Sequence, residues 1–375
     1  MTAKLNYPQF WMLVLAWLVA DLATPLVIRF CRCIGAVDRP HTYKIHKEPM
    51  PLLGGSALFL AFAVAIFSIL RFTTFEDNLP VFGIVLAALL VTALGTLDSF
   101  RPIWAVAKLG LLLVVTMVLS QFGVRISLTG IWGVDLALTL LWISGVSSAM
   151  NSMDNMDGAA TGTAAVASFW TFYVAWYSEP LGQAPVSYVA VSLLGACLGF
   201  LRYNFKPASI FLGDGGSLLL GFLLAALTVQ CGWARDDKLK AVIVPCAILC
   251  VPLYDITLST LLRIKQGVVK GPIEAIVYCG RDHLSHRLVA LGLSQREAVM
   301  LLYLLGMLSG TVAIIVARPE VTRGFYIPVT VVSLLALGVL GLLLDRAKVY
   351  PHQPAAAPAP PDPVAEASPA AEPRR

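Results

Sequence analysis

Residues 81–97 read VFGIVLAALLVTALGTL, an apolar stretch without a charged side chain that ends directly before Asp98. As a helix rising about 1.5 Å per residue, such a stretch approaches the roughly 30 Å hydrocarbon core of a bilayer. It can cross lipid only as a helix, because each backbone N–H and C=O must then be bonded within the segment. The stretch therefore predicts a transmembrane helix, and similar runs recur along the chain.

The composition of the 375 residues points the same way. Hydrophobic residues make up 58% of the chain, charged residues only 13%, and the mean hydropathy is +0.79. Soluble domains are nearer half apolar and about a quarter charged. These values exclude an ordinary globular protein, a disordered chain and a fibrous repeat. The net charge of +5 does not indicate a nucleic-acid partner, because the basic residues gather in short loops between apolar segments.

Segments of nearly 20 apolar residues predict an all-α, polytopic membrane protein with about 11 transmembrane helices. The predicted spans are 8–29, 51–71, 81–97, 104–120, 129–150, 160–177, 186–203, 211–231, 239–262, 297–317 and 326–344. They define one membrane domain over residues 1–345. After Tyr350 the chain becomes rich in Pro and Ala, so residues 346–375 are predicted to form a disordered tail.

Basic residues are unevenly divided between the two sides of this topology. Most Lys and Arg lie in the loops near 30–50, 98–104, 151–160, 203–210 and 263–296, and at the helix ends beside them. The positive-inside bias places these loops in the cytoplasm. We therefore expect the N-terminus outside, the C-terminus inside, and a location in the inner (plasma) membrane.

Acidic and histidine side chains gather on the same predicted cytoplasmic side. They come from well-separated loops and helix ends: Asp38, His41, His46, Asp98, Asp154, Asp157, Asp214, Asp255, Glu274, Asp282, His283 and His286. Charge near the bilayer core is costly and usually functional. The set predicts a polar site at a membrane surface; the alternative is a group of ordinary solvated loop residues.

Two glycine-flanked acidic segments suggest binding of a metal or a phosphate. Asp154 and Asp157 in Asn151–Gly158 are three residues apart, which on one helical turn would place both carboxylates on one face. Asp214 lies in a glycine cluster at the predicted start of a helix, where backbone N–H groups can approach a phosphate and the carboxylate can ligate Mg²⁺. A helix N-cap in a tight turn is the alternative for Asp214.

The loop at 280–288 carries two histidines and two arginines, Arg281, His283, His286 and Arg287. Arginine can bind phosphate oxygens with two parallel hydrogen bonds, so this cluster predicts an anion site. Zinc is a competing interpretation, but no cysteine stands nearby at the usual spacing. For Asp255 and Arg263, eight residues apart on one predicted helix, a structural ion pair is an open alternative to a functional role.

In order along the chain, these segments resemble the polyprenyl-phosphate N-acetylhexosamine-1-phosphate transferases, a family that includes GlcNAc-1-phosphate and phospho-MurNAc-pentapeptide transferases. The resemblance runs from about Asp38 to Leu288 and is most specific in 142–158, 203–217 and 283–288. It implies ten or eleven spans and a cytoplasmic site. The chain departs from the family pattern at Ser99, which replaces a second acid, at Ser148, at Leu52, and at Ser285, which interrupts a histidine run.

The resemblance implies a Mg²⁺-dependent phosphoglycosyl transferase of cell-envelope polysaccharide synthesis. It would move a HexNAc-1-phosphate, with GlcNAc as first choice, from a UDP-sugar to a polyprenyl (undecaprenyl) phosphate and release UMP. Phospho-MurNAc-pentapeptide transfer is the alternative within the family. A catalytically weakened lipid or nucleotide binder and a secondary transporter are the alternatives outside this activity. The expected partners are the UDP-sugar, polyprenyl phosphate and membrane lipids, with a homodimer left open.

The same resemblance assigns roles to individual residues. The catalytic set is Asp98, Asp157, Asp214, His283 and His286; the substrate-binding set is Lys44, Lys108, Asn151, Asp154, Asn204, Arg281 and Arg287. Asp214 is expected to be the main ligand of Mg²⁺, with Mn²⁺ as a substitute, and Asp154 is expected to complete the metal shell. Asp98 would position or deprotonate the lipid phosphate, and Lys44 and Lys108 would pair with phosphates. The loop at 280–288, called the histidine loop below, would hold the diphosphate or sugar.

Overall fold

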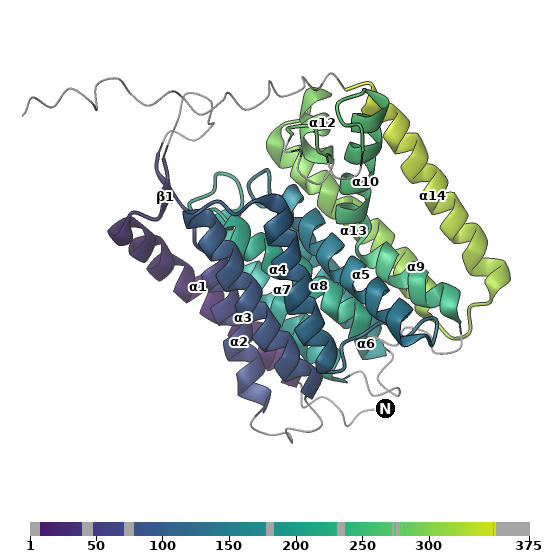
Figure 1. Cartoon of the computed structure of the whole chain (residues 1–375), viewed down its shortest axis with the longest axis horizontal. Helices are drawn as coiled ribbons and strands as arrows, with labels where there is room; N and C mark the ends of the chain where they lie inside the picture. Colours follow the sequence, from purple (N-terminus) through teal and green to yellow (C-terminus); the bar gives the residue numbers. More distant parts are fainter. Residues whose placement is uncertain are drawn as a thin grey trace, which may run out of the picture.

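The structure is a computed structural model, and it describes residues 8–39, 48–70, 79–177, 184–230, 237–271, 274, 278, 280–347 and 349. Within that part, the chain is helical apart from one antiparallel pair of two-residue strands, β1 (Val37–Asp38) and β2 (Met50–Pro51) (Figure 1). Val37 is paired with Pro51 and Asp38 with Met50. Most of the tail predicted for residues 346–375 lies outside the described residues.

The helices follow the predicted apolar segments closely. They are α1 (Pro8–Ile34), α2 (Gly54–Leu70), α3 (Leu79–Phe100), α4 (Ala105–Gln121), α5 (Trp132–Met153), α6 (Ala159–Tyr177), α7 (Ala184–Asn204), α8 (Gly213–Gln230), α9 (Lys238–Ile248), α10 (Cys250–Lys265), α12 (Leu284–Ala290), α13 (Gln295–Ala317) and α14 (Arg323–Asp345). Each of the first eight predicted spans coincides with one helix, the ninth with α9 and α10 together, and the last two with α13 and α14.

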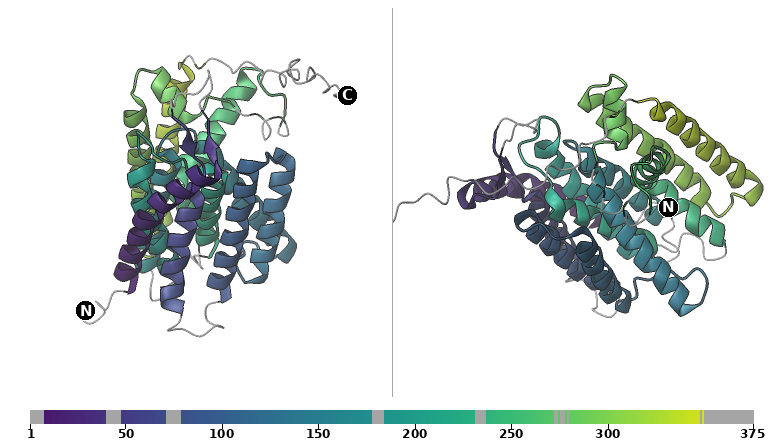
Figure 2. Two further views of the ribbon diagram at one scale, coloured as in Figure 1. Left: turned by 90° about the vertical axis from the view of Figure 1, so that its left-hand side faces the viewer. Right: turned by 45° about the horizontal axis from the view of Figure 1, so that its top comes forward.

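By length and composition, seven of the described helices can cross a membrane, or eight if α9 and α10 form one bent span. The apolar helices at Gly54–Ile69 and Ala105–Gln121 are shorter. The chain is therefore a polytopic, all-α membrane protein. The start of α1 and the end of α14 lie at opposite ends of the bundle (Figure 2).

Helix α8 forms the centre of the bundle. Every residue from Gly215 to Thr228 is buried, as expected for a helix that is apolar all round. It packs against α2, α3, α5 and α6. Because its neighbours enclose it on all sides, its N-terminus, with Gly213 and Asp214, is held in a fixed place at one end of the bundle.

Glycines bring two of these helices very close to α8. A Cβ atom on Gly95 of α3 would lie 2.4 Å from the backbone oxygen of Asp214, and one on Gly55 of α2 would lie 2.3 Å from the backbone nitrogen of Gly216. Real Cβ atoms do not approach backbone so closely, so these positions require glycine. The close approach puts the end of α3, with Asp98, beside the start of α8.

The ninth predicted span is broken at Leu249, where α9 and α10 meet at 82°. Pro252 lies in the first turn of α10, where its missing N–H would have no partner within that helix. The same missing N–H prevents α9 from continuing as a straight helix. The break turns α10 toward the end of the bundle that carries α12 (Figure 1).

We predict that Gly95→Ala weakens the protein, because the new methyl group must push α3 away from α8. Overpacking of this kind costs about 1–3 kcal/mol of folding free energy. The matched control is Gly110→Ala in α4, where an added Cβ meets nothing within 4 Å. Thermal unfolding in detergent should show a lower midpoint for Gly95→Ala only; equal midpoints for the two variants would contradict the close packing of α3 on α8.

Candidate functional site

A cavity of about 2470 Å³ opens at the end of the bundle where α3, α5, α7 and α10 finish and α4 and α8 begin. Nine of the predicted site residues line it: Lys108, Asn151, Asp154, Asp157, Asn204, Asp214, Arg281, His283 and His286. The cavity continues between helices along apolar side chains of α4 and α5, among them Leu109, Leu112, Leu138 and Leu141. It therefore joins a polar chamber to an apolar groove.

The polar chamber contains two carboxylates that share one ammonium group. Lys108 Nζ lies 2.5 Å from Asp98 Oδ2 and 3.2 Å from Asp214 Oδ2. Asp98 is further fixed by the backbone N–H of Ile103, which donates to its Oδ1 at 2.6 Å. The Asp98 side chain is only 5% exposed, whereas that of Asp214 is 40% exposed. Asp214 thus faces the cavity and Asp98 supports Lys108 from behind.

Asp154 and Asp157 reach the same chamber from the segment between α5 and α6. Burial, then the negative charges of Asp214 and Asp157, raise the pKa of Asp154 to about 7. Asp154, Asp157 and Asp214 all line the same cavity. Asp157 Oδ2 accepts a hydrogen bond from the backbone N–H of Ala208 at 3.2 Å.

The prediction that Asp154 and Asp157 share one helical turn is wrong. Helix α5 ends at Met153, and α6 starts only at Ala159. Gly158 between them has a φ of +79°, the left-handed conformation that glycine adopts readily. The turn breaks the helix, yet both carboxylates still line the one cavity.

The two predicted asparagines have structural partners. Asn151 Oδ1 accepts from Ser217 Oγ at 2.6 Å, which joins the end of α5 to the second turn of α8. Asn204 is 2% exposed; its Oδ1 accepts from Thr161 Oγ1 at 2.8 Å and its Nδ2 donates to the Ile210 carbonyl at 3.0 Å. Both residues therefore hold the chamber walls together as well as lining them.

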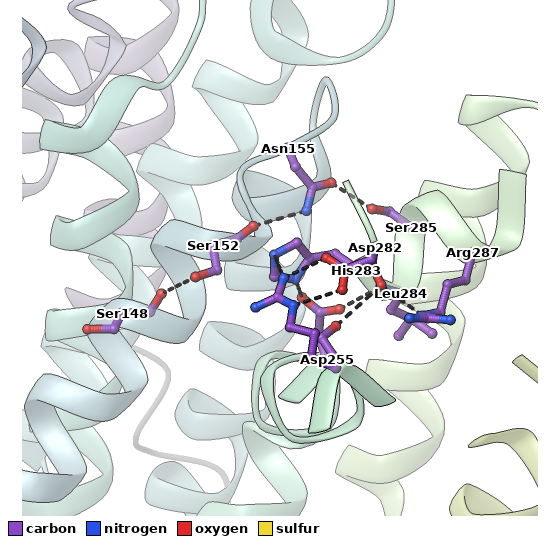
Figure 3. A network of polar contacts seen from close by, with 11 residues as sticks. Ser148, Ser152, Asn155, Asp255, Asp282, His283, Leu284, Ser285 and Arg287 are labelled. Atoms are coloured by element: carbon purple, nitrogen blue, oxygen red, sulfur yellow. Dashed lines mark hydrogen bonds and ion pairs between the residues drawn. The ribbon is translucent and has the colours of Figure 1, made fainter. Parts of the chain in front are cut away.

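Opposite the carboxylates, the histidine loop is fastened to α10. His283 Nδ1 lies 2.9 Å from Asp255 Oδ2, and Asp255 Oδ1 accepts from the Leu284 N–H at 2.6 Å. Arg263 donates to both oxygens of Asp282, at 2.7 and 2.6 Å; Figure 3 shows Asp255, Asp282 and His283 close together. Asp255 and Arg263 are therefore each paired with the loop, not with one another as the structural alternative had it.

The predicted residues of the histidine loop differ in exposure, and not all of them line the cavity. His286 is half-buried, Arg281 is exposed, and both line the cavity. Arg287 is 1% exposed and is not among the lining residues; its Nε donates to the Asp282 carbonyl at 2.8 Å. Arg287 therefore contacts the backbone of its own loop at Asp282 and does not line the cavity. Lys44, also predicted to bind substrate, lies outside the described residues.

The protonation of the loop follows from its surroundings. Burial, then the charges of His283 and Arg281, lower the pKa of His286 to about 4, although Asp255 and Asp282 oppose this effect. His286 is therefore neutral at pH 7. Burial raises the pKa of Asp282, but the hydrogen bonds and charge of Arg263 outweigh it and leave that pKa below its ordinary value.

The donor set suits a hard divalent cation. Carboxylate oxygens are the ligands that Mg²⁺ prefers, and the bond of Lys108 to both Asp98 and Asp214 shows that two of them are close enough to share one positive charge. Among the described residues, no three His, Cys, Asp or Glu side chains already converge as a formed metal site. Cation binding would therefore rearrange the side chains around Asp214.

Sequence reasoning missed the side chains that fasten the histidine loop. Asn155 and Ser285 were not among the predicted site residues, yet Ser285 Oγ donates to Asn155 Oδ1 at 2.6 Å. The only sequence signal for this pair was that Ser285 stands where the resemblance leads one to expect histidine.

Comparison with known proteins matches this site to one family. The model of glycosyl transferase family 4 matches residues 81–232, a range that holds the cavity residues from Lys108 to Asp214. The "probable undecaprenyl-phosphate N-acetylglucosaminyl 1-phosphate transferase" of Bacillus subtilis is 30% identical over 349 residues, which cover 90% of this chain and 93% of the relative.

Two further relatives carry related names. A decaprenyl-phosphate N-acetylglucosaminephosphotransferase of Mycolicibacterium smegmatis is 31% identical over 74% of each chain. A phospho-N-acetylmuramoyl-pentapeptide-transferase of Streptococcus mutans is 32% identical over 58% of this chain and 70% of the relative.

We predict that His286→Gln reduces the acid sensitivity of the fold. Because the folded pKa of His286, about 4, lies below the ordinary value of about 6.5, neutral His286 stabilises the fold above pH 6.5. This stabilisation is lost as the pH falls toward 4. The unfolding midpoint should therefore drop less between pH 6.5 and 4.5 in the variant than in the wild type. Parallel pH profiles would contradict a depressed pKa.

Proposed function

The chain belongs to the polyprenyl-phosphate N-acetylhexosamine-1-phosphate transferases of glycosyl transferase family 4, and from this premise we propose that it transfers GlcNAc-1-phosphate from UDP-GlcNAc to undecaprenyl phosphate and releases UMP. The observation that carries the proposal is the joined cavity. Its polar chamber has carboxylates and Lys108 on one wall and His286 and Arg281 on the other, and it opens into an apolar groove. A charged sugar nucleotide and an isoprenoid lipid can meet only in such a place.

In the proposed reaction, a phosphate oxygen of the lipid attacks the phosphorus that carries the sugar. The bond from that phosphorus to the bridging diphosphate oxygen breaks, and UMP leaves with that oxygen. The lipid phosphate is largely ionised near neutral pH, so its attack needs no strong base. The main physical obstacle is instead the repulsion between two anionic reactants in a poorly hydrated site.

We assign Asp214 and Asp154 as the residues that would hold Mg²⁺, with Mn²⁺ as a substitute. When bound, the ion supplies positive charge that neutralises the diphosphate. Asp157 would hold the nucleotide side of the donor, and Arg281 and His286 the diphosphate and sugar. Lys108 would neutralise the incoming lipid phosphate, and Asp98, which is nearly buried against Lys108 Nζ, would hold that ammonium in place.

The apolar groove along Leu109, Leu112 and Leu141 would take the isoprenoid tail, with the break between α9 and α10 beside it. We extend the topology to eleven spans, with the N-terminus outside, the cavity at the cytoplasmic face of the inner membrane, and the C-terminal tail in the cytoplasm. Support comes from the match of each predicted apolar segment to helix and from the distribution of basic residues between loops.

For the donor, UDP-GlcNAc is preferred over UDP-MurNAc-pentapeptide because Ser285 interrupts the histidine run of the latter branch. A screen of UDP-sugars with undecaprenyl phosphate in detergent, read out by the mass of the lipid product, tests this choice. If none of the donors yields UMP, a catalytically weakened lipid or nucleotide binder is favoured. That alternative is suggested by Ser99, which stands where the family has a second acid. A transporter would move a solute across vesicles without forming a lipid product.

We predict that Asp214→Ala abolishes nearly all Mg²⁺-dependent UMP release, because it removes the carboxylate that pairs with Lys108 and lines the cavity. Asp157→Ala should also abolish nearly all UMP release, because Asp157 would hold the nucleotide side of the donor. The matched control is Asp345→Ala, which removes an acid paired with the exposed Lys265 at 2.5 Å and should retain activity. Turnover of Asp214→Ala near that of the wild type, with the protein inserted, would refute the metal assignment.

A further prediction concerns Ser99, whose Oγ donates back to the Gly95 carbonyl at 3.0 Å. Aspartate at this position adds a second negative charge beside Asp98. We expect Ser99→Asp to keep or raise the rate of UMP release and to lower the Mg²⁺ concentration needed for half of it. Complete loss of activity would show that the chamber is built around the hydroxyl group.

A further inference from the structure

One hydrogen bond joins the two walls of the polar chamber. Ser285 Oγ donates to Asn155 Oδ1 at 2.6 Å, and Figure 3 shows the two side chains pointing at one another. Asn155 stands between Asp154 and Asp157, and Ser285 between His283 and His286. The bond therefore links the segment that supplies acids to the segment that supplies imidazole and guanidinium groups.

The Asn155 end of this bridge is fixed by α5. Asn155 Nδ2 donates to the Ser152 carbonyl at 3.0 Å, in the last turn of that helix. This bond turns the amide so that its oxygen, and not its nitrogen, faces Ser285. The amide is thus used at both ends, and its acceptor is aimed across the chamber before any ligand arrives.

The Ser285 end is fixed by α10. Ser285 is 2% exposed, and α12, on which it lies, is held by Asp255 through the Leu284 N–H. Arg263 Nη2 lies 3.3 Å from His283 Nε2. His283 Nδ1 lies 2.9 Å from Asp255 Oδ2, so the imidazole ring is held on both sides.

The contacts that hold the histidine loop to α10 pair opposite charges. Two carboxylates, Asp255 and Asp282, stand with two guanidinium groups, Arg263 and Arg287, around His283. A buried cluster in which opposite charges are paired resists displacement, since loss of one partner leaves an unpaired charge. The cluster is thus a rigid base from which Ser285 reaches Asn155.

We propose that Asn155 and Ser285 are positioning residues that fix the distance between the wall of Asp154 and Asp157 and the wall of Arg281 and His286, so that the diphosphate and sugar of the donor are gripped between them. The inference rests on the proposed function and adds a pair of residues to which no role has been given. It concerns the sugar nucleotide alone, because the apolar groove along α4 and α5 runs away from this bridge.

The test is a double-mutant cycle with Ser285→Ala, Asn155→Ala and the double variant. Each single change should raise KM for UDP-GlcNAc about ten-fold, which is the scale of one lost buried hydrogen bond. The double variant should be no worse than either single one, because both remove the same bond. KM for undecaprenyl phosphate should stay within about two-fold of the wild type.

Two further variants separate positioning from general damage. Ser333→Ala removes a hydroxyl that bonds to the Val329 carbonyl within α14, away from the residues that line the cavity; it should behave as the wild type. Ser285→Thr keeps the hydroxyl and should restore donor KM to within a few-fold.

Unchanged donor KM in both alanine variants, or equal rises in donor and acceptor KM, would overturn the inference while the wild type still releases UMP. A wild type that releases UMP from no donor would instead refute the proposed function, and this inference with it.

Discussion

The site depends on the cost of leaving charge unpaired at the end of an apolar bundle. In water, two carboxylates and an ammonium interact by about 1 kcal/mol per pair at contact, but at lower effective dielectric the same contacts are several times stronger. Asp98 and Asp214 both lie against Lys108, so each depends on that lysine as a counterion. Every helix that supplies one of these groups must therefore begin or end at the same depth in the bundle.

Two features of the chain satisfy this demand. The first is α8, whose burial on all sides leaves Asp214 one available place, with Gly95 and Gly55 letting α3 and α2 approach it. The second is the break at Leu249, which lets α10 leave the axis of α9 and carry Asp255 and Arg263 to the histidine loop. One wall of the chamber is thus set by packing at the centre, and the other by a helix that does not continue straight.

Sequence alone predicted the helices well because lipid imposes a simple rule: a long apolar run must be a helix, and its ends must be near water. It also predicted which polar residues gather, since helix ends on one side of a membrane are brought together by the topology itself. The sequence did not predict which of these side chains pair with one another. Nothing local to Asp255 shows that it meets His283 and not Arg263, and the three-residue spacing of Asp154 and Asp157 does not show that the two lie in a turn and not on a helix. Arg287 illustrates the same limit: its type indicates an anion, but its neighbours place it behind the loop.

The charge of the chamber bears on the departure at Ser99. Asp98 and Asp214 carry two negative charges against one positive charge on Lys108, so this group holds a single excess negative charge before any cation binds. A second acid at position 99 would double that excess in a place where Asp98 is almost entirely buried. With serine, the hydroxyl returns to its own helix at Gly95 and adds no charge beside Asp98. The lysine then remains shared between Asp98 and Asp214, and the exposed side of Asp214 is left facing the cavity, where a cation and a diphosphate would approach it together.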